Sequence, residues 1–112
     1  MNNVLESERA RHNEQVLAQY RRQHNAQQIQ SWQQATDLAN QDYYQQAHVS
    51  NTGHNAVAPN YDYVDNQFYC YYPTGYTYVY HNNGWIDAFH PDGNVYRKAP
   101  DSNIFEWFYR YS

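Results

Sequence analysis

The chain has 112 residues, a formal net charge of −4 and 16% charged residues. This length is typical of a single domain, and the weak negative charge argues against nucleic acid as a partner, because duplex binding needs a concentrated basic surface. With one cysteine, Cys70, the chain can form no internal disulfide and no CxxC metal or redox site.

The apolar residues are too scattered to form a membrane segment. No apolar run approaches the roughly 20 residues that a membrane-spanning helix needs. The N-terminal sequence MNNVLESERARHNEQ also lacks the apolar stretch of a signal peptide. We therefore expect a cytoplasmic protein that does not bind membranes.

The composition divides the chain into two halves. Residues 1–50 carry eleven glutamines and no glycine or proline, whereas eleven of the fourteen tyrosines follow residue 60. Residues 48–60 have the small and polar composition of a loop. We predict one domain over 1–112, with a helical arm at 1–47, a loop at 48–60 and a tyrosine-rich antiparallel sheet at 61–112.

The first half has the periodicity of an amphipathic helix. Apolar and small residues recur at spacings of three and four, with Leu38 beside them: Ile29, Trp32, Thr36, Ala39 and Tyr43. A single straight helix over 3–47 would be roughly 65–70 Å long, far more than a radius of gyration of about 13 Å allows. The arm is therefore either two helices broken near 21–28 or one long helix that reaches another subunit.

A second apolar stripe lies nearer the N-terminus and has little of its own chain to cover it. Its members are Leu5, Val16, Leu17 and Tyr20. This stripe predicts a homo-oligomer held together by the N-terminal helix.

The second half reads as an antiparallel meander. Alternating aromatic and β-branched residues predict strands near 67–72, 76–81, 85–90, 94–98 and 104–111. The last segment could equally begin a short helix. The fold class is α+β, with the helical arm packed on a four- or five-stranded antiparallel meander.

The turns between these strands decide which side chains share a face. Asn83-Gly84 and Asp92-Gly93 have the composition of two-residue type I′ turns, and 73–75 fits a three-residue loop. This register puts Tyr69, Tyr71, Thr77, Val79, Ile86, Ala88 and Val95 on one face, which we assign to the core under the helix. A slip of one residue would exchange the faces.

The opposite face is then too aromatic for an idle surface, and we predict that it binds another protein. The predicted binding residues are Tyr72, Tyr76, Tyr78, Tyr80, Trp85, Phe89 and Tyr96. The chain would act without catalysis, as an inhibitor, adaptor or assembly subunit. Small acidic proteins of this kind are common among bacterial and phage inhibitors, including counter-defence proteins.

A ligand-binding sheet is the alternative function. Asn83-Gly84-Trp85 within a tyrosine-rich hairpin resembles the hairpins of bacterial cell-wall-binding repeats, although the motif occurs only once. That resemblance implies a surface for carbohydrate or cell-wall glycan. Aromatic sheets also stack the bases of single-stranded nucleic acid.

No residues have the spacing of a catalytic or metal site. In the predicted register, His81 and His90 lie at opposite ends of their strands, roughly 13 Å apart. Cys70 has no positioned base or acid and reads as a small core residue. We therefore predict no enzymatic activity, no metal and no cofactor.

Overall fold

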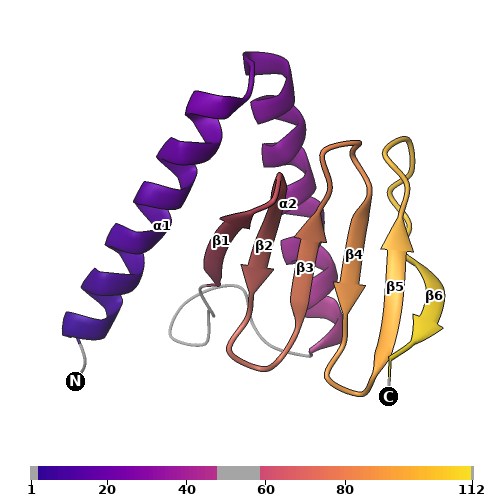
Figure 1. Cartoon of the computed structure of the whole chain (residues 1–112). Helices are drawn as coiled ribbons and strands as arrows, with labels where there is room; N and C mark the ends of the chain where they lie inside the picture. The colour runs from indigo at the N-terminus through magenta and orange to yellow at the C-terminus, as the bar shows by residue number, and fades with distance from the viewer. Residues whose placement is uncertain (1–2, 48–58, 112) are drawn as a thin grey trace.

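The computed structural model describes residues 3–47 and 59–111, and the side chains from residue 8 onward within these ranges. Two helices precede one antiparallel sheet whose six strands follow the chain order (Figure 1). The elements are α1 (Asn3–Gln23), α2 (Ala26–Gln46), β1 (Asn60–Val64), β2 (Gln67–Tyr71), β3 (Thr77–Tyr80), β4 (Ile86–Phe89), β5 (Asn94–Lys98) and β6 (Glu106–Arg110). The predicted α+β class is confirmed, with six strands in place of four or five.

The helical arm breaks between α1 and α2, inside the stretch where its apolar pattern lapses. Asn25 caps α2 with a capping box: its side chain accepts the Gln28 N–H, and the Gln28 side chain accepts the Asn25 N–H. The His24 ring stacks on Tyr20 at 4.1 Å between ring centroids and steadies the corner. The two helices therefore form a hairpin on the sheet.

The additional strand is β1, which lies at the start of the predicted sheet. Its hairpin with β2 turns through Asp65 and Asn66, which have φ values of 55° and 64°. Asp and Asn tolerate this left-handed conformation, so the hairpin forms without a glycine. Of the predicted loop at 48–60, residues 48–58 lie outside the described residues, and Asn60 begins β1.

Three turns of the sheet share one design, a three-residue loop that ends in a glycine with positive φ. In the β3–β4 turn, the Gly84 N–H donates to the His81 carbonyl at 2.9 Å, and the His81 N–H donates to the Trp85 carbonyl at 2.8 Å. A Cβ on Gly84 would lie 2.9 Å from the Pro100 Cβ, so the position requires glycine. The loop at 73–75 has the predicted length, but the two-residue turns predicted at Asn83-Gly84 and Asp92-Gly93 are wrong by one residue.

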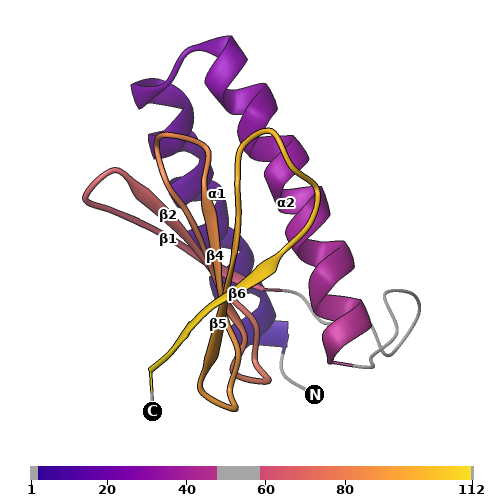
Figure 2. The ribbon, with the colours of Figure 1, turned by 90° about the vertical axis from the view of Figure 1, so that its right-hand side faces the viewer.

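This one-residue difference moves the side chains of β4 to the other face relative to β2 and β3. The helices cover the tyrosine face rather than the face of Val79 and Val95, so the predicted core assignment is wrong. Tyr80 pairs with Ile86, and Tyr78 pairs with Ala88. Residues with side chains toward the helices include Tyr61, Tyr63, Phe68, Cys70, Tyr72, Tyr76, Tyr78, Tyr80, Ile86, Ala88 and Tyr96. The helices lie on one side of the sheet only (Figure 2).

The tyrosines therefore form the core, and their hydroxyls bond to the helix that covers them. The Tyr43 ring stacks on Tyr72 at 3.7 Å between centroids. The Tyr78 hydroxyl donates to Asp42 at 2.6 Å, and the Tyr72 hydroxyl donates to the side chain of Asn40. An apolar ring with a polar tip fits this interface, because the ring is buried while the tip meets the polar side of α2.

The stripe predicted for a helix-mediated oligomer is used within the chain. Val16 and Tyr20 are buried, and Leu17 packs against the same core cluster. Tyr20 meets Tyr63 and Phe68 edge-to-face. Leu5 lies in α1, in the stretch 3–7 whose side chains are not described. Three of the four stripe residues therefore pack within the chain, and an oligomer through this helix stays a prediction.

Tyr78→Phe should destabilise the fold, because the charge-assisted hydrogen bond to Asp42 is lost inside the interface. We expect a loss of about 2 kcal/mol in the free energy of unfolding, measured by urea denaturation. Tyr76→Phe is the matched control, since the Tyr76 hydroxyl reaches only the Gln46 carbonyl at 3.4 Å near the surface. Equal effects of the two variants would contradict this packing.

Candidate functional site

The face of the sheet away from the helices is the open face, and it carries a second aromatic set. Its members are Tyr69, Tyr71, Trp85, Phe89, Phe108, Tyr109 and Tyr111, around Val79 and Val95. Of the predicted binding residues, Trp85 and Phe89 lie here. The other five lie on the helix side, and Tyr72, Tyr78 and Tyr80 are buried in the core.

An ion pair between neighbouring strands organises the centre of the open face. Asp87 on β4 is opposite Arg97 on β5 and is 7% exposed. Arg97 Nε donates to Asp87 Oδ1 at 2.7 Å, and Arg97 Nη2 donates to Oδ2 at 3.2 Å. Burial raises the pKa of Asp87, but hydrogen bonds from Arg97 and His81 outweigh it and leave the pKa below its ordinary value.

His81 completes the network. Its Nε2 lies 2.9 Å from Asp87 Oδ2, and its Nδ1 lies 3.1 Å from Gln67 Nε2. The Tyr69 hydroxyl in turn donates to Gln67 Oε1 at 2.8 Å. One arrangement satisfies all three bonds: a neutral imidazole that donates from Nε2 and accepts at Nδ1. His90 points to the other face, between the rings of Tyr76 and Tyr96.

Aromatic rings cover the Arg97 guanidinium from the outside. The Phe108 ring centroid lies 4.0 Å from its central carbon, and the Trp85 centroid lies 5.5 Å away. Asp87 orients the Arg97 guanidinium by accepting two of its N–H groups, and the Phe108 and Trp85 rings make cation–π contacts with it. Arginine and aromatic side chains thus meet on this surface, and these residue types dominate binding hot spots.

The described groups offer little to acid–base or metal chemistry. Cys70 lies on the helix side, is fully buried, and has a pKa raised to about 12 by that burial. It cannot supply a thiolate to the His81–Asp87 pair on the opposite face. Among the described residues, no three His, Cys, Asp or Glu side chains are grouped closely enough to hold a metal ion.

The two edges of the sheet differ. At β1, side chains of α1 bond the outward backbone: Asn13 accepts the Tyr61 N–H and donates to the Pro59 carbonyl, while His12 Nε2 lies 2.9 Å from the Tyr61 carbonyl. At β6, the strand pairs with β5 on one side and forms the last strand of the sheet (Figure 1). A row of backbone donors and acceptors on an uncovered edge can accept another strand.

No other described strand pairs with this edge, and large apolar side chains concentrate there. Trp107 is 60% exposed and Ile104 is 67% exposed. Phe108, Tyr109 and Tyr111 are exposed as well. We call these four aromatic residues and Ile104 the β6 edge. The sequence predicted this strand from its alternation. It did not reveal the exposure, because every residue of β6 is exposed rather than every second one.

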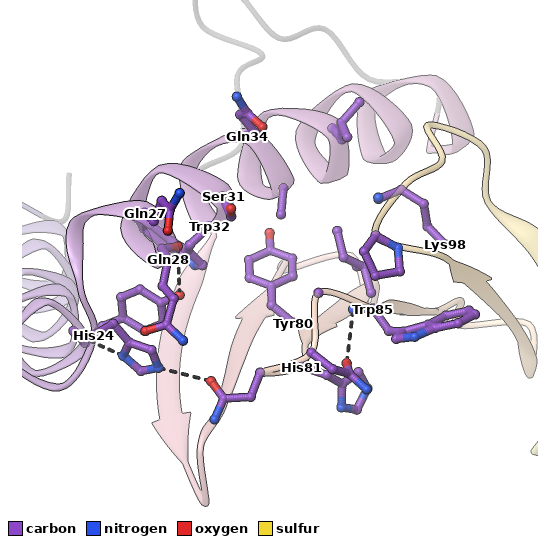
Figure 3. A pocket seen from close by; sticks show the side chains of 18 of the residues that line it. His24, Gln27, Gln28, Ser31, Trp32, Gln34, Tyr80, His81, Trp85 and Lys98 are labelled. Atoms are coloured by element: carbon purple, nitrogen blue, oxygen red, sulfur yellow. Dashed lines mark hydrogen bonds between the residues drawn. The ribbon is translucent and has the colours of Figure 1, made fainter.

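A cavity of about 470 Å³ lies between α2 and the β3–β4 turn (Figure 3). Trp32, Tyr80 and Lys98 line it, with amide side chains such as Gln34 and Asn82 around them. Within the described residues, the buried atoms Trp32 Nε1 and the Tyr80 hydroxyl have no hydrogen-bond partner. The Lys98 ammonium is bonded to the carbonyls of Ala99 and Ser102. Further polar side chains, among them His24, Gln28 and Ser31, line the cavity as well.

Comparison of the chain with protein-family models, curated proteins and solved structures found no match. Neither of the described helices combines the length and apolar character needed to cross a membrane.

Asp87→Asn should lower stability by about 2 kcal/mol at neutral pH, because Arg97 and His81 lose a charged acceptor. A lowered folded-state pKa stabilises the protein above the unfolded pKa, and this contribution is lost as the pH falls through the folded value. The difference between wild type and variant should therefore shrink below about pH 3.8. Urea denaturation at several pH values measures it. A difference that is constant from pH 7 to pH 3 would contradict the ion pair, and Asp101→Asn is the exposed control.

Proposed function

We propose that this chain is a non-enzymatic protein-binding module that binds its partner at the β6 edge. The observation that carries the proposal is the uncovered edge of β6 with its exposed aromatic side chains. Protein binding without catalysis is the function predicted from the sequence, but the binding surface is now the β6 edge rather than the tyrosine face of the sheet. A cytoplasmic location stays a prediction.

Backbone pairing supports this reading. An extended segment can add to a sheet edge, where main-chain hydrogen bonds supply affinity and alternate side chains supply specificity. The opposite edge is closed to such a partner, since Asn13 and His12 of α1 already occupy the Tyr61 backbone groups. One edge is therefore protected and the other is available.

Side chains beside the edge support it as well. Interface energy concentrates in aromatic and arginine residues, where truncation can cost about 2 kcal/mol or more. Trp107, Phe108 and Tyr109 project from the edge strand, and Arg97 is already fixed under Phe108 at 4.0 Å. A partner would meet groups whose conformations are largely set before binding, which lowers the entropic cost of association.

Site-specific photo-crosslinking tests the proposal in cells that naturally carry the protein. We expect Trp107→p-benzoylphenylalanine to give one discrete protein adduct on irradiation, lost when Phe108→Asp is added. The same photoreactive residue at the exposed Gln19 of α1 should give none. Absence of any protein adduct at position 107, or equal adducts at both positions, would contradict binding at the β6 edge.

A further inference from the structure

The cavity between α2 and the β3–β4 turn is lined by hydrogen-bonding side chains that carry no negative charge. Seven of its lining residues have a side-chain amide, among them Gln28, Gln34 and Asn82, and Ser31 adds a hydroxyl. The chain has eleven acidic residues, yet none of them is among the described residues that line this cavity. Its volume of about 470 Å³ lies within the range of small-molecule sites, about 300–1,000 Å³.

Lys98, the only lysine of the chain, brings a positive charge to the cavity wall. The register places it on the helix side of the sheet, in a row with Ile86 and Tyr80 across three neighbouring strands. It is 3% exposed, and its ammonium donates to the carbonyls of Ala99 and Ser102, at 2.7 Å each. Neither of the two ion pairs found among the described residues includes it.

The surroundings of this buried ammonium favour an anion in the cavity. An ammonium has three N–H donors, and the two carbonyls that Lys98 reaches are neutral. Burial lowers the pKa of Lys98, and the exposed Asp101 offsets this effect only in part. Because buried charges in proteins are ordinarily paired, an anion beside Lys98 is stabilising. One lysine matches the single charge of a carboxylate better than the nearly double charge of a phosphate monoester.

Two aromatic residues that line the cavity each have a buried polar atom with no partner among the described residues, Trp32 at Nε1 and Tyr80 at its hydroxyl. The indole N–H can only donate, and the hydroxyl can donate as well. Figure 3 shows Trp32 on the helix side of the cavity and Tyr80 and Lys98 on its sheet side. These donors suit a ligand rich in acceptor oxygens, and the amide side chains can both donate to and accept from hydroxyl groups.

We propose that this cavity binds a small carboxylate with several hydroxyl groups, of the chemical class of sugar acids. The carboxylate pairs with Lys98, and the hydroxyl groups bond to the amide side chains of the wall. Aromatic rings such as Trp85 supply the apolar area that small-molecule sites need. No residue of the β6 edge lines the cavity, so this site is separate from the proposed protein-binding surface.

Titration with matched probes separates the contribution of the charge from that of the hydroxyl groups. D-Glucuronate and D-galacturonate carry both, D-glucose carries hydroxyl groups alone, and acetate carries the charge alone. The indole N–H signals in ¹⁵N NMR spectra report binding, because Trp32 and Trp85 line the cavity and Trp107 does not. We expect a saturable shift of the Trp32 signal with at least one uronate and none of the Trp107 signal. Glucose and acetate should bind about tenfold more weakly or less, since each lacks one set of contacts.

Lys98→Gln removes the charge from the cavity wall and should weaken uronate binding by about tenfold or more. Arg11→Gln, the same loss of charge at an exposed site on α1, should leave the affinity unchanged. Circular dichroism checks that both variants are folded, and the comparison of probes on the wild type needs no variant. The proposal is overturned if neither uronate shifts the Trp32 signal saturably, or if glucose or acetate binds as tightly as the uronates. A folded Lys98→Gln protein with wild-type affinity would overturn it as well.

Discussion

The length of three turns decides which side chains of neighbouring strands share a face of the sheet. Each turn spans three residues and ends in a glycine with φ near +100°, at Gly75, Gly84 and Gly93. This arrangement is a type I turn followed by a left-handed residue. Because side chains alternate along a strand, a turn shorter by one residue would send the side chains of the following strand to the opposite face. The stacking of Tyr43 on Tyr72 and the bond from Tyr78 to Asp42 depend on that parity.

Periodicity predicted the elements well, because it needs only approximate positions. Trp32, Ala39 and Tyr43 share one helical face and are buried as expected. To predict which side chains share a face, the exact length of each turn must be known. Dipeptides such as Asp92-Gly93 did not reveal that length. Pro91 carried the missing signal: a two-residue turn would ask Pro91 to donate a backbone N–H that it lacks. The β1 strand was missed because its turn uses Asp65 and Asn66 with no glycine.

The candidate site could not be predicted for the same reason. In the two-residue register Lys98, rather than Arg97, would lie opposite Asp87, so the network with His81 was invisible from spacing alone. The sequence showed that the aromatic residues concentrate in the sheet, but it did not show how they divide between the two faces. One set forms the core beneath α2, and the other surrounds Arg97 and continues to Phe108 and Tyr109 at the β6 edge. An aromatic sheet in so short a chain thus supplies both the core and an exposed aromatic surface.

The central claim is that the helices cover the tyrosine face, and interproton contacts measured by NMR test it most directly. With selectively labelled Val, Ile and aromatic side chains, we expect contacts from Trp32 to Phe68 and from Tyr43 to Tyr72, whose ring centroids lie 4.7 Å and 3.7 Å apart. The Val79 methyl groups should show none to either helix residue. Strong contacts from Trp32 or Tyr43 to Val79, with none to Phe68 or Tyr72, would show that the faces are the other way round.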